Sequence, residues 1–192
     1  MPADDRSQAV RVSTGMFDTV NDDNPGGGSS APGFAPAQAG AKVTVDRALV
    51  NISLSTNRYE GTLQYVQTLS TDTTVNQLGT LVFWADRATY KVSTAVSTYG
   101  VENFAGVALG AYPQPGKWGF IKIAEGGGRT LVNFSGTTPA AGETCLAQSG
   151  SNIATRVAAG TDIKGYTFGV VQGAKTVGDC AVVAFGLHGA QS

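Results

Sequence analysis

The sequence has few charged residues, few cysteines and almost no histidine, and each shortage argues against a class of function. Charged residues make up 14% of its 192 residues, against about 25% in average proteins. The formal net charge is -1 and the basic residues are scattered. The sequence therefore predicts neither a nucleic-acid surface nor a membrane surface. One histidine and two widely spaced cysteines do not make a metal site, and no cofactor is predicted.

Long apolar runs are missing as well. The longest falls far short of the ~20 residues that a membrane-spanning helix needs. Residues 1–6 are acidic and polar and lack an apolar stretch, so this end is not expected to be a secretory signal.

The residues that could perform catalysis form no recognisable motif. Cys145 and Cys180 both lie inside apolar runs, which predicts buried thiols. A disulfide between them stays open, since it requires neighbouring strands with Cα atoms less than about 7 Å apart. His188, the single histidine, is followed by a glycine near the end of the sequence and is not expected to activate either thiol. The carboxylates fall in no pairing motif, so the chain is not expected to be an enzyme.

Glycine, by contrast, is abundant, with 26 residues, roughly twice the usual ~7% share. Gly- and Pro-containing breaks separate short apolar runs that are rich in β-branched and aromatic residues, a pattern typical of strands. These runs are 104–109, 118–123, 130–134, 144–147, 166–171 and 180–185. Residues 42–192 are therefore predicted to form an all-β body, a compact antiparallel β-sandwich or β-barrel with little or no helix.

Residues 1–41 differ from this body. They hold four of the seven prolines and the run NDDNPGGGSS, and such sequence resembles a linker. The segment nevertheless carries apolar side chains that a purely solvated tail would not need: Val10, Val12, Met16, Phe17 and Phe34. We therefore expect an extended N-terminal arm that becomes ordered against a partner. A disordered leader, or a strap across its own domain, is the alternative.

Two further patterns give local expectations. Ala48, Val50, Ile52 and Leu54 alternate with other residues, which predicts a half-buried strand with a bulge or bend near Asp46. Residues 125–129 (EGGGR) precede another apolar run and are expected to form a hairpin loop rather than a phosphate-binding loop.

Five aromatic residues allow two interpretations. They could form a platform that binds sugars, although aromatic residues within strands more often belong to the core. The residues concerned are Phe83, Trp84, Tyr112, Trp118 and Phe120.

The order of features over residues 76–187 resembles a known class of proteins. The stretches that carry the likeness are 78–83 (LGTLVF), 104–108 (FAGVA), 119–123 (GFIKI), 131–132 (LV), 141–147 (AGETCLA), 166–171 (YTFGVV) and 180–185 (CAVVAF). Together they are similar to the small β-rich decoration, or cement, proteins of tailed-phage capsids. The likeness covers about 60% of the chain, leaves out residues 1–75, and assigns no individual functional residue.

The resemblance implies a structural virion protein on the outer surface of a capsid, assembled in the host cytoplasm. Its partner would be the major capsid protein, and it would self-associate as a homo-oligomer, with a trimer favoured. The alternative function is a carbohydrate-binding or adhesive β-sandwich module of a virion fibre or surface protein.

Overall fold

The computed structural model describes residues 39–45, 60–72, 78–109, 114–148, 151–158 and 166–186. The predicted strand over 48–55 and its bend near Asp46 lie outside these ranges. The described elements, in chain order, are β1 (Lys42–Val45), β2 (Gly61–Thr68), β3 (Leu81–Asp86), β4 (Lys91–Ser93), α2 (Val96–Tyr99), η2 (Val101–Asn103), β5 (Phe104–Ala108), β6 (Trp118–Lys122), β7 (Arg129–Asn133), β8 (Thr144–Ala147), β9 (Thr155–Val157), β10 (Tyr166–Val177) and β11 (Cys180–Phe185).

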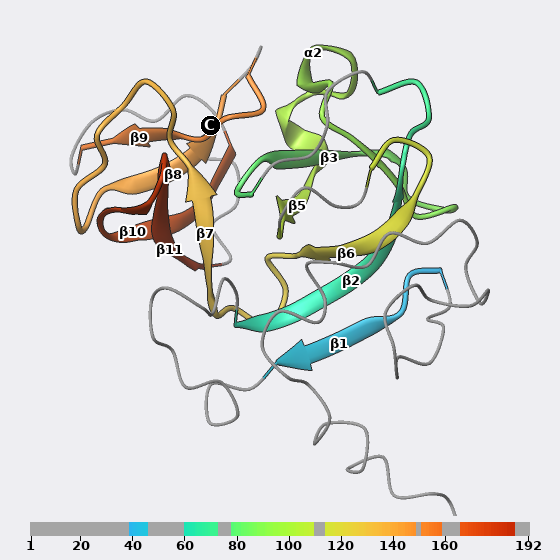
Figure 1. Cartoon of the computed structure of the whole chain (residues 1–192), viewed down its shortest axis with the longest axis horizontal. Helices are drawn as coiled ribbons and strands as arrows, with labels where there is room; N and C mark the ends of the chain where they lie inside the picture. The colour runs from blue at the N-terminus through green and yellow to red at the C-terminus, as the bar shows by residue number, and fades with distance from the viewer. Residues whose placement is uncertain are drawn as a thin grey trace, which may run out of the picture.

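The first sheet closes on itself as a barrel. Its strands run β2-β4-β3-β5-β6, and β6 pairs back with β2, which closes five strands into a ring. β2 has two neighbours on its other edge, since β1 pairs with residues 61–64 and β4 pairs in parallel with Gln67 and Thr68. β1 is thus a sixth strand outside the closed ring (Figure 1).

The inside of the barrel is filled by one small apolar cluster. Each of the five ring strands contributes to it or is directly followed by a contributor: Val66, Val82, Val92, Ala105, Ile121 and Ile123. On β3 the neighbours of Val82, Leu81 and Phe83, belong to a different cluster outside the barrel. Because successive side chains of a strand point to opposite faces, the unbroken apolar run of β3 means that both of its faces are buried.

The second sheet holds five antiparallel strands in the order β7-β11-β10-β8-β9. Buried and half-buried side chains alternate along its strands, as in a sheet that has one covered face. On β11, for example, Ala181, Val183 and Phe185 join the core, whereas Val182 and Ala184 are only half-buried. Figure 1 shows this sheet beside the barrel, with β7 running down to the start of β2.

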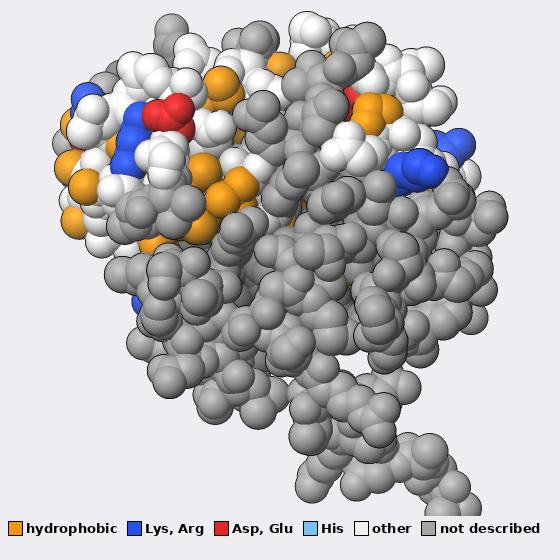
Figure 2. Space-filling view, in the orientation of Figure 1, with side chains coloured by type: hydrophobic (Ala, Val, Ile, Leu, Met, Phe, Trp, Pro, Cys, Tyr) orange, Lys and Arg blue, Asp and Glu red, His pale blue; other side chains and the backbone are white. Residues whose placement is uncertain are grey.

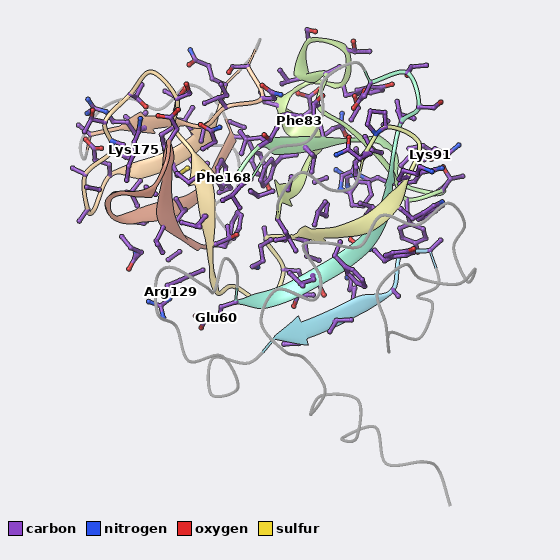
Figure 3. All side chains as sticks on the ribbon, viewed as in Figure 1. Glu60, Phe83, Lys91, Arg129, Phe168 and Lys175 are labelled. Atoms are coloured by element: carbon purple, nitrogen blue, oxygen red, sulfur yellow. The ribbon has the colours of Figure 1, made fainter. Side chains whose placement is uncertain are left out.

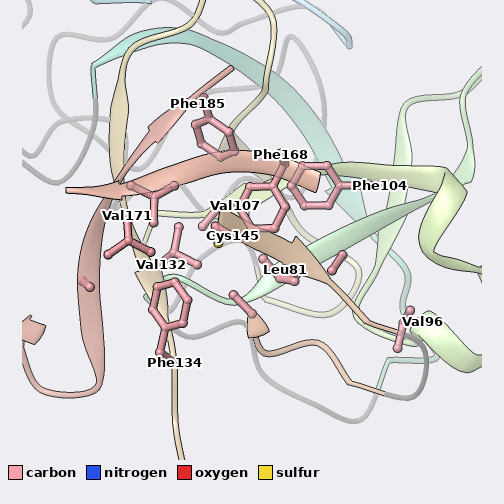
Figure 4. Packing of buried hydrophobic residues seen from close by; sticks show 14 of the residues in the cluster. Leu81, Val96, Phe104, Val107, Val132, Phe134, Cys145, Phe168, Val171 and Phe185 are labelled. Carbon is pink, nitrogen blue, oxygen red and sulfur yellow. The ribbon is translucent and has the colours of Figure 1, made fainter. Parts of the chain in front are cut away.

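The largest core lies between the barrel and the second sheet. β3 and β5 supply Leu81, Phe83, Phe104 and Val107, and the second sheet faces them with residues such as Phe168 (Figure 4). Phe104 of the barrel stacks on Phe168 with ring centroids 4.7 Å apart and planes at 20°. Phe83 meets Phe104 edge-on at 6.1 Å, and Phe168 contacts Phe185 at 5.5 Å. Aromatic rings therefore run without a break from one layer to the other.

A third apolar cluster lies on the outer face of β2 and β6. Tyr65 stacks on Trp118 at 5.6 Å and contacts Phe120 at 5.0 Å. Ala41 and Val43, just before and within β1, pack against this cluster. The strand outside the ring thus covers an apolar surface that the barrel itself leaves open.

The predicted all-β fold is confirmed, and each of the six C-terminal apolar runs overlaps a strand. The only described helices are the single turns α2 and η2, in line with the expected lack of helix. The hairpin predicted at 125–129 is wrong, since β6 and β7 belong to different sheets.

Because Phe168 contacts Phe104 across the two layers, removing its ring should lower the free energy of unfolding. Phe168 is 1% exposed, so Phe168→Ala leaves a cavity in the main core and should lower the free energy of unfolding by about 3–5 kcal/mol. Gln172→Ala, at an exposed position of the same strand, serves as the control and should change it by less than ~0.5 kcal/mol. Urea unfolding measures both. A loss of under ~1 kcal/mol for Phe168→Ala would show that the two layers do not depend on this contact.

Candidate functional site

The residues predicted to bind a partner lie outside the described part of the chain. These are Val10, Val12, Met16, Phe17 and Phe34. The structure does describe the last three residues of the predicted arm, Ala39–Ala41, which are hydrogen-bonded to β2. Gly40 N donates to Tyr65 O at 2.9 Å, and Tyr65 N donates to Ala41 O at 2.8 Å. The arm thus begins from a fixed point on the barrel.

Tyr90 packs against this fixed point. A Cβ on Gly40 would lie 2.2 Å from the Tyr90 ring, so only glycine allows the backbone to pass this close. Tyr90 is also the only non-glycine residue of the described chain with a positive φ, 56°. Such a conformation is uncommon for a bulky residue and must be held by its surroundings.

The turn before Tyr90 provides part of that support. The Asp86 carboxylate accepts hydrogen bonds from Thr89 Oγ1 at 2.6 Å and Ala88 N at 2.9 Å. The Thr89 bond is the main cause that lowers the pKa of Asp86. A carboxylate that closes its own turn in this way fixes the end of the β3–β4 hairpin.

The most unusual polar group in the described chain is Lys122, at the end of β6. Its side chain is 0% exposed, a rare state for lysine. Its Nζ donates to Ile123 O and to Gly127 O, both at 2.6 Å, and lies 4.8 Å from the centre of the Phe185 ring. Burial lowers the pKa of Lys122 to about 8, while Glu60 opposes this shift. Lys122 thereby connects the barrel, the loop after β6 and the last strand of the second sheet.

Two ion pairs lie near Lys122. Arg129 Nε lies 3.2 Å from Glu60 Oε2, and Figure 3 shows the two residues together near the start of β2. Lys42 of β1 pairs with Glu125 of the loop. Two backbone bonds complete the contact: Glu60 N donates to Arg129 O at 2.6 Å, and Phe185 N donates to Gly128 O at 2.8 Å. We refer to Glu60, Lys122, Gly127, Gly128, Arg129 and Phe185 as the Lys122 junction.

The glycine run carries the chain from one sheet to the other, which is why the predicted hairpin does not form. Gly126, Gly127 and Gly128 all have positive φ, at 75°, 61° and 85°. A Cβ on Gly128 would lie 2.1 Å from Glu60 O. The run therefore turns sharply against residue 60 and begins β7 in the second sheet, with no hydrogen-bonded return along β6.

The candidate nucleophiles are not brought to a site. Cys145 and Cys180 are both buried, as predicted, and do not form a disulfide with each other. Burial raises the pKa of the Cys145 thiol, which opposes formation of the reactive thiolate. Cys180 Sγ lies 3.4 Å from Leu78 O. His188 lies outside the described residues.

Most of the aromatic residues considered for a sugar platform belong to the interior. Phe83 is 0%, Phe120 1% and Trp118 7% exposed, so these three rings present no face to a ligand. Trp84 is half-buried against the barrel interior, and Tyr112 lies outside the described residues.

The described residues show neither a cluster of charge on the face seen in Figure 2 nor a metal-binding group. In Figure 2 the acidic and basic side chains of the described residues are few and lie apart in small groups on the visible face. Within the described ranges no group of three or more His, Cys, Asp or Glu residues could hold a metal ion. None of the helices in those ranges is long and apolar enough to cross a membrane.

Comparison with known proteins adds no family: the chain matches no protein-family model, and no curated protein matches it.

Sequence reasoning missed the Lys122 junction, although one signal was present. In the run 118–123 (WGFIKI), a lysine stands among apolar residues. The alternation placed Lys122 on the same face as Trp118 and Phe120, which are buried. A lysine at such a position normally extends its ammonium group to water, and the carbonyls of Ile123 and Gly127 and the Phe185 ring explain why this one does not.

The low pKa of Lys122 predicts how stability depends on pH. Between about pH 8 and its ordinary value of 10.5, the unfolded chain binds more protons at this residue than the folded chain does. The free energy of unfolding should therefore rise with pH across this window, by about 3 kcal/mol in total, relative to Lys122→Met, which cannot titrate. Below pH 8 the difference between the two proteins should be constant. Urea unfolding from pH 7 to pH 11 measures it, and parallel curves would contradict the prediction.

The close approach of Gly128 to Glu60 predicts how substitutions of glycine change the free energy of unfolding. Gly128→Ala must both hold a positive φ and move Glu60, whereas Gly136→Ala, at φ 78° with nothing within 4 Å, pays only for the backbone conformation. Gly136→Ala should therefore cost about 1–2 kcal/mol of unfolding free energy, and Gly128→Ala should cost about 1–3 kcal/mol more. Equal losses in thermal or urea unfolding would show that the contact with Glu60 is not tight.

Proposed function

We propose that this chain is a structural virion protein, a decoration or cement protein that binds the outside of an assembled phage capsid and stabilises it. The observation that carries the proposal is the match between the resemblance and the strands. Every stretch on which the likeness rests overlaps a strand, and those strands are β3, β5, β6, β7, β8, β10 and β11. They build much of the barrel and most of the second sheet.

The architecture supports this role on physical grounds. A protein that holds shell subunits together needs a stiff body, because flexibility between its contacts would weaken the link. Here one continuous core joins the barrel to the second sheet, and both faces of β3 are buried. A closed barrel also has no free edges within its ring, which limits unwanted strand pairing.

The partner in this proposal is the major capsid protein, and the chain acts as a homo-oligomer, with a trimer favoured, on the capsid's outer surface. Symmetric copies multiply a modest contact through avidity. In this proposal the arm extends that contact, and its last residues are fixed to the barrel, because Gly40 and Ala41 are hydrogen-bonded to Tyr65. A carbohydrate-binding module remains the alternative, but the buried Phe83, Trp118 and Phe120 give it no support.

Capsid melting tests the proposal. A protein that binds only the assembled shell raises the shell's melting temperature by mass action, so capsids stripped of this protein should melt earlier and recover when it is added back. The protein should also co-purify with intact capsids at a fixed ratio. An unchanged melting temperature, together with no co-purification, would refute the proposal, and binding on a glycan array would favour the alternative.

The contribution of the arm can be tested separately. The structure indicates that the deletion should end at residue 38, because Ala39–Ala41 belong to the hydrogen-bonded edge of β2. Removing residues 1–38 should leave the unfolding of the body unchanged and weaken capsid binding at least tenfold. The full chain is the control. Equal decoration by the two proteins would show that the arm is a passive leader.

A further inference from the structure

The barrel and the second sheet are held together differently at the two ends of β7. At the Asn133 end, two backbone hydrogen bonds link the layers: Asn133 N to Gly79 O at 3.0 Å and Leu81 N to Asn152 O at 2.8 Å. At the Arg129 end, the link is the Lys122 junction, with the backbone bond from Glu60 N to Arg129 O, the contact of Lys122 with the Phe185 ring and the glycine run between β6 and β7.

The Lys122 junction has a buried charge that is only partly compensated. Lys122 Nζ has two carbonyl acceptors and one aromatic ring as its neighbours. Glu60 attracts it, but the Glu60 carboxylate is already paired with Arg129, a second cation. On the side of β1, Lys42 and Glu125 neutralise each other. Removing an ammonium group from water is expensive unless a counter-charge is fully available.

Separating the two layers at the Arg129 end of β7 would reduce the cost of keeping the Lys122 ammonium group out of water. If the start of β7 and the end of β11 move away from β2, water reaches Lys122 and hydrates its charge. The glycine run can absorb the movement, because glycine adopts many backbone conformations at little cost. The bonds at Gly79 and Asn152 lie at the other end of β7 and do not need to break.

We propose that the Lys122 junction is a proton-sensitive hinge between the barrel and the second sheet, which opens more readily when Lys122 is protonated. The hinge closes most firmly when the amine is neutral, because the junction then buries no unbalanced charge. The inference concerns the body alone and does not depend on the proposed role on a capsid.

The expected size of the effect follows from linkage. Lys122 has a pKa of about 8 in the closed state, and the hydrated lysine of an open state has its ordinary value of 10.5. The opening equilibrium constant should then be about tenfold larger at pH 7 than at pH 9. The sign is fixed because the open state binds the proton more tightly.

Amide hydrogen exchange of the full chain, corrected for intrinsic rates, measures this opening. The reporter is the amide of Glu60, which donates to Arg129 O across the junction. The controls are the amides of Gln67 and Val171, which donate within the barrel and within the second sheet. The Glu60 amide should be less protected than the controls, and its opening should fall about tenfold from pH 7 to pH 9. Equal protection of Glu60 and the controls would overturn the inference, since the junction would then open only with the whole fold.

Two variants identify the group responsible. Lys122→Arg keeps its charge throughout, so its junction should open as readily at pH 9 as at pH 7. Lys122→Met carries no charge, so its opening should also be independent of pH. A tenfold pH response that persists in either variant would assign the effect to another group and refute the inference. If Lys122→Met fails to fold, the wild type and Lys122→Arg still decide the question.

Discussion

The structure depends on the contact between the Phe104 and Phe168 rings, because neither layer is complete without it. The barrel fills its own interior with small aliphatic side chains, but the outer faces of β3 and β5 are apolar and need a cover. The second sheet has no separate core, because its single apolar face is buried only against the barrel. The stack of Phe104 on Phe168, with ring centroids 4.7 Å apart, therefore joins the apolar faces of the two layers into one core. Aromatic pairs of this kind add packing energy beyond the area that they bury.

Much of this fold could be predicted from the sequence, and the limits have physical causes. Strands such as β10 and β11 were recognisable because glycine and polar breaks separate runs of β-branched and aromatic residues. Closure of the barrel was not predictable, since it rests on the pairing of β2 with β6, which lie more than fifty residues apart. The hairpin at 125–129 was wrong for a related reason: three glycines permit a tight return, but they equally permit a passage to another sheet.

The Lys122 junction illustrates a different limit. A lysine inside an apolar run has two outcomes, because its long stem can lie on an apolar surface with the ammonium in water, or the whole side chain can be buried. What decides between them here is the carbonyl of Gly127 at 2.6 Å and the Phe185 ring, which comes from the end of the chain. Neither neighbour follows from local pattern. The partner-binding residues predicted in the arm, such as Phe17, lie outside the described residues, so that part of the prediction stays a prediction.

The same features bear on how a body of this kind could hold a partner. Two of its surface ion pairs, Arg156 with Glu143 and Lys175 with Asp179, are satisfied within the second sheet, and exposed pairs of this type contribute little to stability. They do, however, leave these charges with no need for a counter-charge on a partner. Contacts would then rest on uncharged surface and on the arm. Because Gly40 is hydrogen-bonded to Tyr65 and covered by the Tyr90 ring, a pull on the arm acts on β2 and on the β3–β4 turn together. Such a load is shared by ring strands of the closed barrel, each of which is hydrogen-bonded on both sides.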